Sequence, residues 1–75
     1  MNHIRDQLLD IARLELDWEG ELPRGALMES FDSMQLMTLV IAVEDRFKIL
    51  LEPEDEDRIA TMEDLIDVIE AKRHG

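Results

Sequence analysis

The sequence predicts an all-α fold, a four-helix bundle with three longer helices and one short third helix. In three segments the apolar residues recur at the spacing of a helix face, and capping side chains precede the second and last of these segments. Between the first and second segments the period stops and glycine and proline appear, which predicts a long loop between helices one and two. A chain of 75 residues forms one domain, and we expect it to span 1–75 as a freestanding protein.

The first helix is expected from Asn2 to Leu16, because its apolar residues lie at helical spacing: Ile4, Leu8 and Ile11, with Leu9, Ala12 and Leu16 beside them. The long loop follows over 18–31, and its apolar side chains are expected to pack it against the core: Trp18, Leu22, Leu27 and Phe31. Trp18 is expected to cover the end of the first helix.

The second helix is expected over 34–47, behind the capping residues Asp32 and Ser33. The acidic segment 52–57 surrounds a proline and predicts a loop with one short helical turn that ends at Arg58 and Ile59. The last helix begins at Thr61, with Asp64 three residues on as a variant of the capping box, and ends near the cations Lys72 and Arg73. Its apolar face holds Leu65, Ile66, Val68 and Ile69.

The second helix carries two apolar stripes. On a wheel of about 100° per residue the core stripe holds Leu36, Leu39, Val40, Val43 and Phe47. An outer stripe, centred roughly 130° away, consists of Met34, Met37 and Ile41, with Glu44 and Asp45 on either side. If neighbouring helices touch both sides, the outer stripe is also core. Otherwise it is a docking strip, whose methionines adapt to several partners and whose acidic border attracts their Lys and Arg.

Ser33 has two alternative roles at the start of the second helix. A serine before an apolar helix is usually a cap. Asp32 is an equally good cap, which would leave the Ser33 hydroxyl free. A phosphate ester on that hydroxyl would lie at the positive end of the helix dipole, where an anion is favoured.

The charge and composition exclude several function classes. Nineteen acidic and eight basic residues give a formal charge of −11, which repels nucleic-acid phosphates and anionic lipid, so we expect basic protein partners and no nucleic acid. Without cysteine, the polypeptide encodes no disulfide, Cys-based zinc site or thiol nucleophile. No stretch reads as a membrane span or signal peptide, so we expect a cytoplasmic monomer.

Catalysis and metal binding are not expected from this chain. Neither His3 nor His74 has a plausible nucleophile near it in the sequence. The acidic segment 52–57 lacks the spaced ligands and central glycine of an EF-hand loop. We therefore expect no enzymatic activity, no catalytic residues and no metal site.

The region around Ser33 resembles the attachment region of acyl carrier proteins. The residues that carry the resemblance are Phe31-Asp32-Ser33-Met34, Leu36, Leu39-Val40, Ala42-Val43-Glu44 and Phe47. In that family an Asp-Ser-Leu motif opens the second helix. The stretch from Arg58 to Leu65 also resembles the family's passage from its short third helix into its fourth, so the resemblance covers nearly the whole chain.

The resemblance implies that Ser33 carries 4′-phosphopantetheine from coenzyme A, with Asp32 and Met34 beside the attachment point. The thiol of this arm would hold acyl intermediates as thioesters for fatty-acid, polyketide or related biosynthesis, which accounts for the missing cysteine. The implied partners are a phosphopantetheinyl transferase and acyl-transferring and synthase enzymes with basic docking surfaces. They would bind through Met34, Met37, Ile41, Glu44 and Asp45.

Several residues depart from the family pattern. Ser30 stands where a glycine often precedes the motif, and Arg46 and Lys48 are further departures. Met34 replaces the usual leucine, an exchange expected to keep the apolar contact. Gln35 and Thr38 stand where fatty-acid carriers frequently have acidic residues, which leaves a specialised pathway as an alternative.

Two further alternatives stay open. Peptidyl and D-alanyl carriers share the fold and the serine, although the strong negative charge favours acyl carriers. From a different class, a helical adaptor that is never modified would bind partners through the outer stripe and use Ser33 only as a cap.

Overall fold

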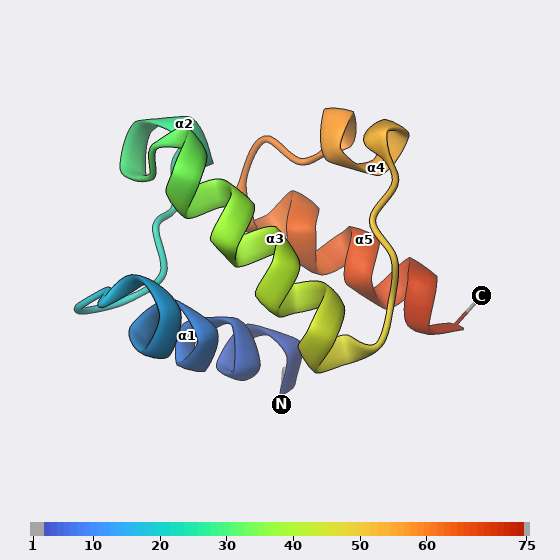
Figure 1. Ribbon diagram of the computed structural model, residues 1–75, viewed down its shortest axis with the longest axis horizontal. Helices are drawn as coiled ribbons and strands as arrows, with labels where there is room; N and C mark the ends of the chain where they lie inside the picture. The colour runs from blue at the N-terminus through green and yellow to red at the C-terminus, as the bar shows by residue number, and fades with distance from the viewer. Residues whose placement is uncertain (1–2, 75) are drawn as a thin grey trace.

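Three long helices make up most of the domain: α1 (His3–Leu16), α3 (Ser33–Phe47) and α5 (Met62–His74). The computed structural model describes residues 3–74, and within them two short helices lie in the connections, α2 (Leu27–Ser30) and α4 (Pro53–Arg58). Figure 1 shows α3 crossing the middle of the molecule, with α1 beneath it, α5 beside it and α4 above α5. No strand forms within residues 3–74, so the all-α prediction is confirmed.

The helix bounds follow the sequence prediction with two differences. The predicted loop over 18–31 contains the four-residue helix α2, which is too short for a period to reveal. Helix α3 already includes Ser33, because Asp32 alone takes the capping position. The predicted first residue of the first helix, Asn2, and the terminal residues Met1 and Gly75 lie outside the described residues.

The core is built from the predicted stripes of the three long helices. Its most completely buried side chains are Leu8, Ile11, Leu39, Val43, Met62, Leu65 and Ile69. Of the predicted core stripe on α3, only Leu39 and Val43 are fully buried, whereas Leu36, Val40 and Phe47 pack against its edge and stay half-buried. The opposite face of α3 is therefore available to solvent.

The segment between α1 and α3 packs against the core as predicted. Leu22, Leu27 and Phe31 are buried. The Trp18 ring lies 4.9 Å from that of Phe31, centroid to centroid, and its indole N–H donates to the Glu21 carbonyl at 2.8 Å. Trp18 therefore covers the end of α1, as its position predicted.

A short backbone contact fixes α2 and the start of α3. Ala26 and Thr61 form an isolated antiparallel bridge, and the Leu27 N–H donates to the Ala60 carbonyl at 2.8 Å. This contact joins the segment before α2 to the junction of α4 and α5. Because only two residues separate α2 from α3, it also holds the beginning of α3 in place.

Polar side chains of the C-terminal half connect its two helices. Thr61 Oγ1 accepts from the Asp64 N–H at 3.2 Å, while Asp64 Oδ2 accepts from Thr61 at 3.1 Å and from Ala60 at 3.0 Å, which confirms the predicted cap of α5. The Lys72 ammonium lies 2.7 Å from Asp55 Oδ2. The pKa of Asp55 is lowered, first by this hydrogen bond, and the pKa of Lys72 is raised by the same contact. This ion pair therefore links α4 to α5.

Candidate functional site

The first turn of α3 is capped by Asp32. Asp32 Oδ1 accepts from the Gln35 N–H at 2.8 Å, and the Asp32 N–H donates to Gln35 Oε1 at 2.9 Å, so the two residues form a reciprocal capping box. Asp32 itself adopts extended backbone geometry, with φ −83° and ψ 178°. The helix therefore does not use Ser33 as its cap.

Ser33 is the first residue of α3 and is exposed to solvent. Its hydroxyl has no hydrogen-bond partner among residues 3–74. A hydroxyl in this position is accessible to another protein and costs no internal hydrogen bond when it is esterified. The alternative in which Ser33 serves only as a cap has no support in this geometry.

The electrostatic setting of Ser33 favours an anion. The N–H groups of Ser33 and Met34 form no backbone hydrogen bond within the described chain, whereas those of Gln35 and Leu36 bond to Asp32. Unpaired N–H groups at a helix start, together with the helix dipole, attract negative charge. The Asp32 carboxylate is close by and reduces this attraction, so the site suits a covalently attached phosphate better than a free one.

The outer stripe is exposed over the N-terminal half of α3. Met34, Met37 and Ile41 are 80%, 65% and 59% exposed. Because neighbouring helices do not cover these side chains, the alternative in which they are core is wrong. An exposed apolar row on an otherwise acidic protein is the kind of surface that binds a partner.

The two carboxylates beside the outer stripe differ in their surroundings. Asp45 is exposed, and its Oδ1 lies 3.9 Å from the Lys48 ammonium. Glu44 is half-buried, and its Oε2 accepts from the Leu51 N–H at 2.8 Å. Glu44 thus holds the connection between α3 and α4, a role that the sequence analysis did not include. Of the two, Asp45 is the residue whose replacement reports on docking alone.

Two of the departures from the family pattern, Gln35 and Thr38, have local explanations. The Gln35 amide completes the capping box, which a carboxylate at this position would also do. The Thr38 hydroxyl donates to the Met34 carbonyl at 3.0 Å, within the helix. The expected apolar contact of Met34 inside the domain is absent, because its side chain projects into solvent.

An apolar hollow of about 190 Å³ lies close to the start of α3. Leu36, less than one turn beyond Ser33, is one of its walls, and Met28 of α2 is another. The remaining lining residues are Leu27, Leu39, Val40, Glu56, Ile59, Ala60 and Leu65. A hollow with this mainly apolar lining can hold a short aliphatic chain.

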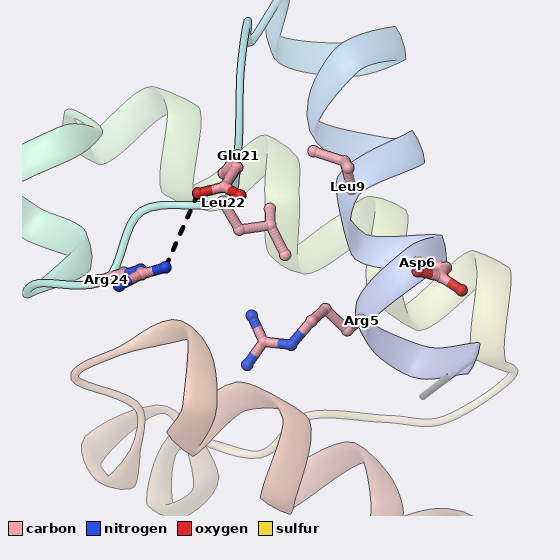
Figure 2. A pocket seen from close by; sticks show the side chains of 6 residues that line it. All are labelled: Arg5, Asp6, Leu9, Glu21, Leu22 and Arg24. Carbon is pink, nitrogen blue, oxygen red and sulfur yellow. Dashed lines mark ion pairs between the residues drawn. The ribbon is translucent and has the colours of Figure 1, made fainter. Parts of the chain in front are cut away.

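A second hollow, of about 330 Å³, lies between α1 and the segment that follows it (Figure 2). The guanidinium groups of Arg5 and Arg24 extend into this region, and the apolar side chains of Leu9 and Leu22 also line it. Arg24 lies 3.8 Å from Glu21, and Arg5 forms an ion pair with Glu63 of α5. Each guanidinium therefore has a carboxylate beside it, and the Arg5–Glu63 pair joins α1 to α5, whereas the Arg24–Glu21 pair lies within the segment that follows α1.

Sequence reasoning missed three exposed apolar residues, Leu14, Met28 and Leu50, which are 70%, 69% and 68% exposed. Leu14 falls outside the buried row of α1 formed by Ile4, Leu8 and Ile11. A leucine away from the apolar stripe of an amphipathic helix is a signal that could have identified it.

Comparison with known proteins finds a partial match to an acyl carrier protein. An acyl carrier protein of an Exiguobacterium species is 42% identical over 41 residues, which make up 55% of this chain and 52% of that protein. The aligned part thus spans about half the length of the curated relative that it matches. No profile of a protein family and no solved structure matches the chain.

The candidate attachment residues therefore lie on a helical scaffold of the expected kind. No helix within residues 3–74 is both long and apolar enough to cross a membrane. The chain is thus similar to an acyl carrier protein over about half of its length, and its architecture is all-helical.

Proposed function

We propose that the chain carries acyl intermediates on a 4′-phosphopantetheine arm attached to Ser33. The observation that carries this proposal is that the neighbouring residues Asp32 and Ser33 have different roles. Asp32 caps α3, and the exposed Ser33 hydroxyl is left without a partner among the described residues. The matched relative is an acyl carrier protein by name, which agrees with this role.

The residues at the start of α3 fit such an arm. Ser33 Oγ would form the phosphodiester bond with coenzyme A as donor, and the nucleotide part of coenzyme A would leave. The N–H groups of Ser33 and Met34 are placed to stabilise the phosphate. When bound, the arm supplies the thiol that a polypeptide without cysteine lacks.

Partner enzymes are proposed to dock on the outer stripe, beside the attachment point. Met34 follows Ser33 directly, and Met37 and Ile41 continue the row over about 11 Å of helix rise. Methionine side chains adapt to differently shaped partners, and the charge of −11 favours enzymes with basic docking surfaces. A phosphopantetheinyl transferase and acyl-transferring and synthase enzymes are the proposed partners.

The apolar hollow between α2, α3 and α5 is proposed to receive part of the acyl chain. Its volume of about 190 Å³ is below the roughly 300 Å³ at which typical ligand pockets begin, so it suits a short chain. The exposed Met28 and the half-buried Leu36 are two of its lining residues.

Intact mass after incubation with coenzyme A and a promiscuous phosphopantetheinyl transferase tests the proposal. We expect the wild type to gain one phosphopantetheine and Ser33→Ala to gain none. Ser30→Ala is the matched control, because Ser30 is the other serine of the chain and lies half-buried at the end of α2. This control should be loaded like the wild type.

The alternative adaptor function predicts a different result. An adaptor that is never modified would show unchanged mass under conditions that load a control carrier protein. That outcome would contradict the carrier proposal while leaving the exposed outer stripe as a binding surface.

A further inference from the structure

The apolar hollow close to the start of α3 has one charged residue in its lining. Of the residues that surround it, all but Glu56 of α4 are apolar. The remaining lining is leucine, isoleucine, valine, methionine and alanine. Glu56 is therefore the lining side chain that can distinguish one acyl chain from another by charge.

The exposure of the lining residues shows which of them lie at the open side of the hollow. Leu27, Leu39 and Leu65 are buried and form its inner wall. Glu56 and Met28 are exposed and therefore lie at its rim. A carboxylate at the rim keeps its contact with water, so the hollow can hold an alkyl chain without burying the charge.

The carboxylate of Glu56 has no hydrogen bond or ion pair within residues 3–74. Its backbone N–H donates to the Glu52 carbonyl at 3.1 Å, and its carbonyl accepts from the Ile59 N–H at 3.1 Å. The neighbouring Asp55, in contrast, forms an ion pair with α5. The side chain of Glu56 is therefore free to meet a group that a bound chain presents, and its replacement breaks no hydrogen bond of the helix.

A polar group at the end of an acyl chain is expected to stay at this rim. The leucine side chains of the inner wall offer it no hydrogen-bond partner, and burial of a polar or charged group without a partner is unfavourable. The methylene groups of the chain can enter the inner part, while its polar end remains in contact with water. The end group then lies at the side of the hollow that holds Glu56.

We propose that Glu56 is a specificity-determining residue for the acyl group, and that the hollow favours short aliphatic chains that end in an ammonium group over chains that end in a carboxylate. This inference rests on the proposed function of Ser33 and on the proposed entry of the acyl chain into the hollow. It names a chemical class of acyl group, which those two proposals leave unspecified.

Attraction and repulsion at the rim act in the same direction. The carboxylate of Glu56 attracts an ammonium group, and it repels a second carboxylate, as does the formal charge of −11 on the chain. Each effect is small because the rim is exposed to solvent. The two effects add when the two chain ends are compared with each other, so this comparison is the most sensitive measurement.

Thermal melts of acylated forms test this inference. A promiscuous phosphopantetheinyl transferase loads hexanoyl, ω-aminohexanoyl or adipoyl groups onto Ser33 from coenzyme A analogues that have an amide in place of the thioester, so that heating does not release the chain. At about 0.15 M salt, charges farther apart than about 8 Å are largely screened. We expect the midpoint of the wild type to be about 2–5 °C higher with the ω-aminohexanoyl group than with the adipoyl group.

Two pairs of variants assign this difference to Glu56. In Glu56→Gln it should fall to about half or less, whereas the matched control Glu54→Gln should keep the wild-type difference. Glu54 is exposed on the same helix but does not line the hollow, so both substitutions remove one negative charge from α4. Glu56→Lys should reverse the order of the two midpoints, and Glu54→Lys should not.

Nuclear magnetic resonance tests separately whether the chain enters the hollow. The backbone amide shifts of Leu27, Leu39 and Leu65 should change when the hexanoyl group is added to the protein that carries phosphopantetheine alone. These residues form the inner wall, so a chain that stays in solvent would leave their shifts unchanged.

The outcomes distinguish this inference from the proposed function. A wild type that no coenzyme A analogue loads, under conditions that load a control carrier, overturns the carrier proposal and this inference with it. A loaded wild type with unchanged inner-wall shifts overturns the entry of the chain and this inference, and leaves the carrier proposal standing. If the shifts change but Glu56→Gln and Glu54→Gln have equal midpoint differences, only the role of Glu56 is overturned.

Discussion

Asp17 ends α1 in a left-handed backbone conformation, with φ 54°. A side chain in this region costs roughly 1–2 kcal/mol for most residues, and glycine avoids this cost. Aspartate and asparagine tolerate the conformation better than other residues, but not as well as glycine. The turn is needed because the Trp18 N–H reaches back to the Ala12 carbonyl at 3.1 Å, which brings the indole over the core.

Replacement of Asp17 by glycine should therefore stabilise the domain. We expect Asp17→Gly to raise the free energy of unfolding by about 0.5–1 kcal/mol relative to Asp17→Asn. The asparagine variant is the control because it removes the same negative charge and keeps a side chain of the same size. Urea denaturation measures both, and a glycine variant no more stable than the asparagine variant would show that φ at this position is not strained.

The sequence alone left the role of Ser33 open. Asp32 and Ser33 are both good caps, so the sequence alone did not decide between them. The choice depends on Asp32 Oδ1 reaching the Gln35 N–H, with Gln35 bonding back. Asp32 and Gln35 lie three residues apart, which is the spacing of a capping box. This spacing could have identified Asp32 as the cap.

Helix α3 carries apolar residues on two faces, but only one of these faces is buried in the core. Leu39 is 1% exposed, whereas Ile41 is 59% exposed. We expect Leu39→Ala to cost about 2–5 kcal/mol of stability, because it leaves a cavity in the core. Ile41→Ala should cost less than about 1 kcal/mol. Denaturant unfolding of the two variants compares them directly, and similar losses would place Ile41 in the core and remove the docking argument.

The ion pair between α4 and α5 should make stability depend on acid pH. The hydrogen bond from Lys72 lowers the pKa of Asp55 below its ordinary value of 3.8. Because the folded-state pKa is the lower one, the stabilisation is present above about pH 4 and is lost as the pH falls through the folded-state value.

Thermal melts of the wild type and Asp55→Asn test this dependence. At neutral pH the wild type should have the higher midpoint, and the difference should shrink progressively below about pH 4. A difference that stays constant from pH 7 to the acid limit would show that Asp55 is not charged more readily in the folded protein. Asp57→Asn is the matched control, because it removes one negative charge from an exposed position of the same helix.

The elements that the sequence predicted well are those with a long apolar period. α1, α3 and α5 were identified because each buries one face, and the cap of α5 was identified because Thr61 and Asp64 have distinctive spacing. α2 was missed because it has only four residues and is held by the contact between Leu27 and Ala60, which lie far apart in the sequence. The structural role of Glu44 was missed for the same reason, since its partner Leu51 lies in another segment.

The charge of the whole molecule should oppose folding at low ionic strength. A formal charge of −11 on 75 residues brings like charges together in the folded state. At 0.01 M salt the Debye length is about 30 Å and falls to about 10 Å at 0.1 M, so added salt screens this repulsion. We expect the thermal midpoint to rise between these concentrations. A midpoint that falls or stays constant would show that self-repulsion does not limit stability.

The outer stripe and the net charge together affect how the whole molecule associates with other proteins. Three exposed apolar side chains would favour self-association in a neutral protein, but the net charge opposes contact between copies of the chain. The same charge attracts basic partners from a distance. The combination fits a protein that meets several enzymes in turn and is released by each.

The measurement that tests the central claim most directly is the position of the added group within the loaded chain. Fragment-ion mass spectrometry of the peptide that contains both Ser30 and Ser33 assigns it to one serine. We predict a single phosphopantetheine on Ser33, because its hydroxyl is exposed and Asp32 caps the helix in its place. A group found on Ser30, or a peptide of unchanged mass, would contradict the account.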